Sequence, residues 1–303
     1  MSRLAESSEP VRIGLKYVQM GTTAAALREV WEVADQAGFD HLWVFDHLLP
    51  LTTSATGWYG AEASDPIFEG WTTLACMAAL TRRVRIGVNV TGNLYRHPAL
   101  LAKMAATVDH FSDGRLEMGI GAAHAEREFV TLGMPFPPVA ERSDRLAEAI
   151  QVMKLLWTRE VADYDGTYYR LEEAICAPKP LQKPHPPIWV GGRGERRTLR
   201  IAAQHADVWN VVGGPPEEAG RLSEVLDRHC EAVGRDPASV RRSVGIRFDG
   251  ADPDAALRAA DAMLAVGFTE LIVTVAGPGA AQDAQRAAEI MIPAFRATGA
   301  AVP

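Results

Sequence analysis

Short apolar runs alternate with longer amphipathic segments along almost the whole of this 303-residue chain. The runs have the length of buried strands, and the segments between them repeat apolar residues at helical spacing. Strict alternation of strands and helices predicts right-handed crossovers and a parallel sheet. Eight such units over this length fit a closed (β/α)8 TIM barrel, with residues 1–303 as a single domain, better than an open doubly wound sheet. The expected strands are residues 11–18, 41–45, 84–90, 115–120, 188–190, 207–212, 243–248 and 270–275.

Two segments interrupt this rhythm. Residues 48–70 are polar and rich in glycine and aromatic residues, and such long loops in compact domains are usually functional. Residues 158–187 follow the fourth expected helix and combine Asp165-Gly166 with paired tyrosines and a proline-rich run, which predicts an inserted hairpin and an extended linker. The expected helices are residues 23–37, 71–80, 98–111, 139–157, 195–205, 216–233, 253–266 and 281–297.

Charge and composition restrict the classes of function. A net charge of −7, from 31 basic and 38 acidic residues, argues against a nucleic-acid binder. No stretch reaches the about 18 apolar residues of a membrane span, and the N-terminal segment lacks the apolar core of a signal peptide, so a cytoplasmic enzyme is expected. No metal site is expected, because the three cysteines (Cys76, Cys176 and Cys230) are far apart and H-E-x-x-H is absent.

Active sites of such barrels lie at the C-terminal ends of the strands, so the polar residues that follow each apolar run are the candidates. Asp46 and His47 directly follow the second expected strand. A carboxylate beside an imidazole can hold a neutral histidine ready for general-base catalysis. The alternative is a capping aspartate next to a packed histidine.

The third and fourth expected strands end in small and polar residues. After the third strand, Asn89-Val90-Thr91-Gly92-Asn93 indicates either a bulge aimed at a ligand or a plain turn. After the fourth, Gly121-Ala122-Ala123-His124 would let the backbone approach a flat ligand or a phosphate. The G-x-G pattern here is weak, since the third glycine of the dinucleotide fingerprint is absent.

The sharpest local pattern is Gly191-Gly192-Arg193-Gly194, between the fifth expected strand and a helix expected from Glu195. Glycines free backbone N–H groups to point at an anion, and a helix N-terminus adds partial positive charge. The segment therefore predicts a phosphate site, with a tight turn and solvated arginines as the alternative. Of two other basic residues, Lys16 is expected in a buried ion pair rather than as a Schiff-base amine, and His97 is expected to cap a helix.

Several segments resemble the bacterial luciferase-like monooxygenase superfamily, in the branch that uses the deazaflavin coenzyme F420. The resemblance covers roughly residues 11–212, whereas the C-terminal third matches only in pattern. It rests on FDHL (45–48), RIGVNVTGNLYRHPALLAKMAATVDHFSDGRLEMGIG (85–121), ERSDRLAEAIQVMKLLW (141–157), DGTYYRLEEAICAPKPLQKPHPPIWVGG (165–192) and RTLRIAAQHADVWN (197–210).

This resemblance implies a barrel with an insertion after its fourth helix. It also implies a non-prolyl cis peptide between Asn89 and Val90, beside Thr91, that supports the cofactor ring. The implied cofactor contacts are Asp46, the small pair Ala122-Ala123 and the phosphate-holding pair Gly191-Gly192. The implied base is His47, while His124 stands where the alcohol-oxidising members have a glutamic acid.

The leading hypothesis is an F420-dependent oxidoreductase that moves a hydride between the cofactor and an alcohol, ketone or activated alkene. Loop residues Trp58, Tyr59, Phe68 and Trp71 would close over the substrate. A sugar phosphate is less expected, because no lysine follows Lys183 and Arg247 is the one obvious anion partner late in the barrel. Alternatives are an FMN-dependent monooxygenase, a non-redox phosphate-binding lyase or isomerase, and a non-catalytic barrel subunit. The resemblance also implies a homodimer formed through the early helices.

Overall fold

The computed structural model describes residues 10–51 and 61–296. Their main sheet has the order β3-β2-β1-β11-β10-β9-β8-β5-β4, its pairings are parallel, and a further pairing of β3 with β5 closes the ring. β3 and β4 are two parts of one barrel strand, so the predicted (β/α)8 barrel is confirmed. The barrel strands are β1 (Arg12–Tyr17), β2 (His41–Val44), β3 (Arg85–Val88), β4 (Thr91–Gly92), β5 (Leu116–Gly121), β8 (Ile188–Gly191), β9 (Val208–Val211), β10 (Arg241–Arg247) and β11 (Glu270–Val275).

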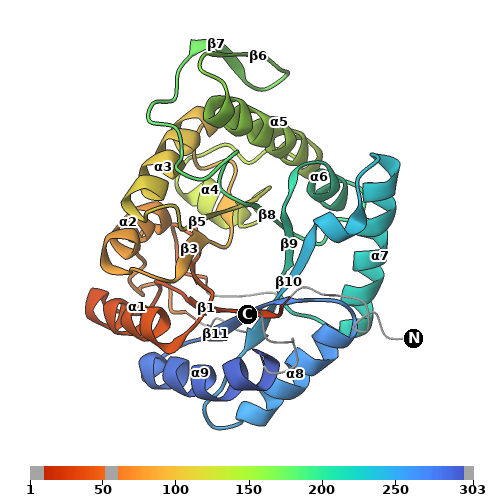
Figure 1. The fold of residues 1–303 in the computed structure, drawn as a ribbon. Helices are drawn as coiled ribbons and strands as arrows, with labels where there is room; N and C mark the ends of the chain where they lie inside the picture. Colours follow the sequence, from red (N-terminus) through yellow and green to blue (C-terminus); the bar gives the residue numbers. More distant parts are fainter. Residues whose placement is uncertain (1–9, 52–60, 297–303) are drawn as a thin grey trace.

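Helices surround the barrel as an outer ring (Figure 1). Within the described ranges none is long and apolar enough to cross a membrane. Two elements were not predicted, α4 (Glu126–Thr131) and a 3₁₀ turn at Pro237–Ser239. The helices of the ring are α1 (Ala24–Ala37), α2 (Gly70–Leu80), α3 (Pro98–Phe111), α5 (Val139–Thr158), α6 (Thr198–His205), α7 (Pro216–Ala232), α8 (Pro253–Ala265) and α9 (Ala280–Arg296).

Local sequence accounts for the ends of these helices. In α1, Thr23 caps the N-terminus by accepting a hydrogen bond from the Ala26 amide, and Gly38 ends the helix in the left-handed region at φ 103°. In α3, Pro98 occupies the first turn and the His97 side chain accepts from the Ala99 amide, which confirms the predicted cap.

The start of α6 was predicted wrongly. Residues 195–197 form a turn, and the helix begins at Thr198 rather than at Glu195. The Leu199 amide donates to the Gly194 carbonyl at 3.0 Å. This hydrogen bond joins residues five positions apart, whereas the bonds of an α-helix join residues four positions apart. The regular helical ladder therefore starts only after this wider turn.

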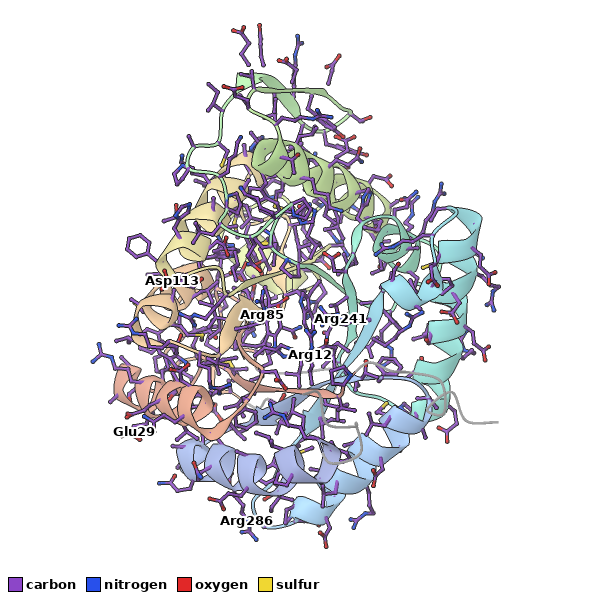
Figure 2. All side chains as sticks on the ribbon, in the orientation of Figure 1. Arg12, Glu29, Arg85, Asp113, Arg241 and Arg286 are labelled. Atoms are coloured by element: carbon purple, nitrogen blue, oxygen red, sulfur yellow. The ribbon has the colours of Figure 1, made fainter. Side chains whose placement is uncertain are left out.

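The barrel interior is filled in layers. Trp43, Trp189, Val208 and Ile272 form a buried apolar layer in its middle. Below it, at the N-terminal ends of the strands, ionic side chains close the barrel. Arg241 and Arg12 pair with Glu270, and Arg85 pairs with Glu117. Figure 2 shows Arg12, Arg85 and Arg241 inside the ring of helices. With the interior closed at this end, a ligand site inside the barrel is left to the opposite end of the strands.

The predicted hairpin insertion is present. β6 (Ala162–Asp165) and β7 (Arg170–Ala174) pair antiparallel and project beyond the ring of helices next to α5 (Figure 1). The carboxylate of Glu148 on α5 accepts hydrogen bonds from the amides of Thr167 and Tyr168, at 2.9 Å each. The helix thereby fixes the hairpin turn on the outside of the barrel.

Candidate active site

A backbone bulge lies at the bottom of the barrel mouth, which is the C-terminal end of the parallel strands. The peptide between Asn89 and Val90 is cis, as the family resemblance implied. Lys16 on β1 donates to the backbone carbonyl of Asn89 at 2.8 Å and to its side-chain Oδ1 at 3.2 Å. Lys16 has no carboxylate partner among the described residues, so the expected ion pair is wrong. On the other side of the bulge, Trp71 Nε1 donates to Thr91 Oγ1 at 2.9 Å.

The Val90 side chain sits against glycines of two neighbouring strands. A Cβ added to Gly121 or to Gly191 would lie 2.9 Å from a Val90 methyl group. Both positions therefore need glycine because Val90 occupies the space, which the sequence pattern had assigned to a ligand. Ala122 and Ala123 follow β5 and are partly buried, and Ala123 has a left-handed backbone with φ 63°.

Asp46 is held by an arginine. Arg96 donates to both of its carboxylate oxygens, at 2.6 and 3.0 Å, and also bonds Glu69. Glu69 in turn caps α2 by accepting from the amides of Trp71 and Thr72. Burial raises the pKa of Asp46, although the Arg96 guanidinium opposes this increase. Asp46, Arg96 and Glu69 thus form a hydrogen-bonded network that connects the mouth to the N-terminus of α2.

The carboxylate that binds His47 comes from α4. His47 Nδ1 and Glu128 Oε1 are 2.8 Å apart, and the Tyr95 hydroxyl donates to the other oxygen of Glu128. The expectation that adjacent Asp46 would hold the imidazole is therefore wrong. Burial opposes ionisation of Glu128, but the hydrogen bonds from His47 and Tyr95 outweigh it and lower the pKa of this carboxyl. Burial and the contact with Glu128 raise the pKa of Tyr95.

A second histidine faces the first. The rings of His47 and His124 are 5.3 Å apart, edge to face. Desolvation and the neighbouring His47 lower the pKa of His124, although its side chain is exposed at the mouth, and this favours the neutral imidazole. The structure therefore brings together the predicted residues His47 and His124, but only His47 has a carboxylate partner among the residues described.

The glycine segment after β8 has features of an anion cradle. Gly192 is fixed to β9, since its amide donates to the Asn210 carbonyl at 3.1 Å and its carbonyl accepts from Trp209 Nε1 at 2.8 Å. The amides of Arg193 and Gly194 donate to no group in the described parts of the chain. Two donors of the predicted cradle thus remain for a ligand, whereas the Gly192 amide is already used.

The side chain of Arg193 points elsewhere. Its Nη2 lies 2.7 Å from Glu218 of α7, and its Nη1 donates to the Gly213 carbonyl at 3.3 Å. Beyond this contact, a pocket of about 420 Å³ lies between the ends of β9 and β10. Arg247, expected from the sequence as an anion partner, lines this pocket together with Gly213, Gly214, Gly245, Asp249 and Asp252.

Of the four aromatic residues expected to cover the substrate, Trp58 and Tyr59 lie outside the described residues. Trp71 was assigned wrongly, because it lies in the first turn of α2 and is only 2% exposed. Its indole packs beneath the bulge and holds Thr91. Phe68 is 37% exposed and remains available at the rim of the loop.

Sequence reasoning missed Glu128, Tyr95 and Arg96. Glu128 is 81 positions from His47 and lies on a helix of six residues without a side-chain cap. Tyr95 and Arg96 fall in the turn between β4 and α3. The available signal for Glu128 was its position soon after the fourth barrel strand, where a carboxylate can reach the mouth.

The fold and this mouth define a class of protein. A family model described as "Luciferase-like monooxygenase" matches residues 8–296, and the chain belongs to that family. Among curated relatives, F420-dependent glucose-6-phosphate dehydrogenase of Microbacterium testaceum is 33% identical over 229 residues, which are 75% of this chain. The match spans 64% of that relative's length, less than two thirds.

Solved structures share the fold at lower identity. An F420-dependent secondary alcohol dehydrogenase in complex with an F420-acetone adduct superposes with a TM-score of 0.81 and 20% identity, over 95% of this chain and 100% of that one. The oxygenating constituent of 3,6-diketocamphane monooxygenase from Pseudomonas putida, in complex with FMN, gives 0.72 and 16%, over 97% and 100%. Likeness at this level of identity establishes a common barrel.

Proposed function

We propose that this protein is an F420-dependent oxidoreductase acting on a small alcohol, ketone or activated alkene. The observation that carries this proposal is His47, held by Glu128 beside the Asn89–Val90 bulge. The named activities of the relative and of the structural neighbour described above support it. When bound, the deazaflavin would supply or accept the hydride at its C5 position.

The mouth of the barrel has unused donors that suit a cofactor with a ring and a phosphate. Asn89 is buried, and its Nδ2 donates to no group within the described chain, so it can meet an acceptor on the ring edge. The free amides of Arg193 and Gly194 suit a phosphate. The proposed cofactor-binding set is Asp46, Asn89, Val90, Thr91, Ala122, Ala123, Gly191, Gly192, Arg193 and Gly194.

His47 would accept the substrate proton in oxidation and return it in reduction. With Nδ1 hydrogen-bonded to Glu128, its Nε2 is the ring atom left to accept a proton from a substrate hydroxyl. The Glu128 carboxylate would then stabilise the imidazolium that forms. In the reductive direction the same Nε2 would return the proton to the carbonyl oxygen. The lowered pKa of His124 favours its neutral form, which would offer a hydrogen bond rather than a charge.

FMN-dependent oxygenation is the second candidate, because a protein that binds FMN shares this fold. The first experiment is a titration of the purified protein with coenzyme F420 and with FMN, followed by tryptophan fluorescence. We expect micromolar or tighter binding of F420 and much weaker binding of FMN. Preferential binding of FMN would favour the monooxygenase, and binding of neither would revive the non-redox and non-catalytic alternatives.

Substitution of His47 tests its proposed role. We expect His47→Ala to keep the affinity for F420 while turnover of the best alcohol or ketone falls by about 10²–10⁴-fold, the usual contribution of a general base. The substrate screen includes glucose 6-phosphate, since a relative is named for it. Unchanged turnover in the variant would remove His47 from the chemistry.

We also propose that two copies of the chain associate through α2 and α3. The sequence of α2, GWTTLACMAAL, contains no charged residue, although Ala75, Cys76, Ala79 and Leu80 on its outer side are exposed. Leu100 and Phe111 of α3 extend this exposed apolar surface and are 55% and 69% exposed. A helix that is apolar all round is normally buried, and a self-complementary contact between two copies would bury this one.

A further inference from the structure

A second pocket lies at the opposite end of the barrel from the candidate active site. It has a volume of about 430 Å³ and is lined by residues that precede β8 and β9 or lie near the C-terminal ends of α5, α6 and α7. In a barrel of parallel strands these segments meet at the N-terminal end of the strands. Its polar lining consists of Lys154, Lys183, His185, Gln204, His205, Asp207 and Arg235.

Positive charge dominates this lining. Lys154, Lys183 and Arg235 face a single carboxylate, Asp207. One oxygen of Asp207 accepts a hydrogen bond from the Ile188 amide at 2.7 Å, so this oxygen is already used as an acceptor at the start of β8. The chain as a whole carries a net charge of −7, which makes a cavity with excess positive charge a distinct local feature.

The cations are held in place and keep donors to spare. Lys154 Nζ donates one hydrogen bond, to the His205 carbonyl at 2.9 Å, and Lys183 Nζ donates one, to the Pro180 carbonyl at 3.0 Å. Arg235 donates to the Ala203 carbonyl at 3.1 Å and to Ser239. Each ammonium has three N–H groups and a guanidinium has five, so further donors remain on all three side chains.

The neighbouring groups respond to this positive field. Burial, Lys154 and Arg235 together lower the pKa of His205 to about 4. Burial also lowers the pKa of Lys154, where Arg235 adds to the effect and Asp207 opposes it. His205 is therefore a neutral imidazole at pH 7, able to donate a hydrogen bond without needing a counter-ion.

We propose that this pocket binds a phosphate-bearing small molecule, at a site separate from the active site. Fixed cations with unused donors, together with a neutral imidazole, suit the several charged oxygens of a phosphate group. The cavity is in the size range of small-molecule sites, which leaves room for more than a free phosphate. The phosphate could belong to an ester or be inorganic, and the test distinguishes the two sources. The site stands independently of the proposed redox function.

The test is calorimetric titration of the purified full chain with inorganic phosphate, pyrophosphate and glycerol phosphate. We expect saturable binding, with the ester or pyrophosphate tighter than inorganic phosphate. Lys154→Gln and Lys183→Gln should each weaken this binding about tenfold or more, as loss of a charge-assisted contact does. Arg28→Gln, which removes an exposed charge on α1, is the matched control and should leave the affinity unchanged.

Two further measurements distinguish binding in this pocket from binding in the glycine cradle after β8. In the wild type, NMR titration should show the pKa of His205 rising from about 4 when the anion is bound, because the anion offsets Lys154 and Arg235. Lys183 is exposed, so Lys183→Gln remains informative if the Lys154 variant fails to fold. Binding that survives both lysine variants but is lost in Gly192→Ala would place the anion in the glycine cradle and overturn the proposal. Absence of binding up to about 10 mM anion would overturn it as well.

Discussion

At the scale of single residues, one carboxylate organises the candidate site. Glu128 accepts from His47 on one oxygen and from Tyr95 on the other, and its side chain is 3% exposed. A buried carboxylate with two donors fixes the position of both partners, because either donor would lose a charge-assisted hydrogen bond by turning away. Glu128 is thus a positioning residue, which acts on the substrate only through His47.

The variant Glu128→Gln tests this role. An amide keeps the shape of the side chain but not the charge that favours an imidazolium at His47. We expect kcat for alcohol oxidation to fall by about 10–10²-fold, while KM and the affinity for F420 stay unchanged. Glu126→Gln, at an exposed position on the same helix, should change none of these quantities. A parallel loss of kcat and of cofactor affinity would indicate a purely structural role.

Lys16 provides a residue-scale prediction about stability. Burial lowers the pKa of Lys16 from 10.5 to about 8, so the unfolded chain binds this proton more tightly than the folded one. The resulting loss of stability is complete below pH 8 and disappears as the pH rises to 10.5. A depression of this size corresponds to about 3 kcal/mol, against about 1–3 kcal/mol for the hydrogen bonds to Asn89. We therefore expect Lys16→Met to stabilise the protein at pH 7 by about 1 kcal/mol.

The pH dependence of this difference is diagnostic. The wild type gains stability as the pH rises from 8 to 10.5, since only the unfolded Lys16 still binds its proton in that window. The advantage of Lys16→Met in urea unfolding should therefore shrink over the same window. Lys183→Met, at an exposed position, is the control and should show no such trend. A variant that is less stable than the wild type at pH 7 would contradict the prediction.

At the scale of elements, the turn between β8 and α6 carries the proposed site for the phosphate of the cofactor. Gly192 has φ 133°, a conformation that L-residues rarely adopt, and an added Cβ would lie 3.1 Å from Thr198 Cγ2. We expect Gly192→Ala to lower the free energy of unfolding by about 1–2 kcal/mol and the affinity for F420 by tenfold or more.

Gly234 offers a matched control for this element. It follows α7 at φ 71°, and no atom lies within 4 Å of an added Cβ. Gly234→Ala should cost about 1 kcal/mol of stability, because alanine pays only the penalty of a left-handed backbone there, and it should leave cofactor affinity unchanged. Thermal unfolding and fluorescence titration of both variants check the pair. Equal affinities would remove Gly192 from the cofactor site.

At the scale of the whole molecule, the prediction concerns the apolar surface of α2 and α3. If two copies meet there, Leu80→Arg places two charges in the contact, and the dimer should dissociate in size-exclusion chromatography with light scattering. Burying an unpaired charge costs several kcal/mol, enough to shift a micromolar dimer to monomer. Val161→Arg, at an apolar residue 48% exposed near the hairpin, should leave the assembly unchanged. A wild type that is monomeric at high concentration would contradict the dimer.

The alternation along the chain was sufficient to predict the barrel. Strand and helix patterns are local, and the buried stripe of α1 (Leu27, Val30, Trp31 and Ala34) follows directly from helical spacing. The turn residues of the hairpin insertion also predicted it. At residues 89–93 the sequence pattern left a bulge and a plain turn open. The cis peptide at Asn89–Val90 came from the family resemblance, since no local rule gives a cis peptide outside proline.

The pairing of functional side chains was not local and could not be predicted in the same way. Asp46 and His47 are adjacent in sequence, and yet Asp46 is bound by Arg96 and His47 by Glu128, 50 and 81 positions away. Successive residues at a strand end point in different directions, so neighbours in sequence need not be neighbours in space. Lys16 likewise donates to the side-chain amide oxygen of Asn89 instead of the expected carboxylate.

By itself, then, the sequence determined the order and type of elements, the barrel, and the strand ends where the candidate site lies. These features depend on periodicity and on turn residues, which act over a few positions. The tertiary structure decided which carboxylate serves His47, that Val90 fills the space left by the glycines, and that cations gather at the far end of the barrel. Those outcomes depend on distances between segments that only barrel closure brings together.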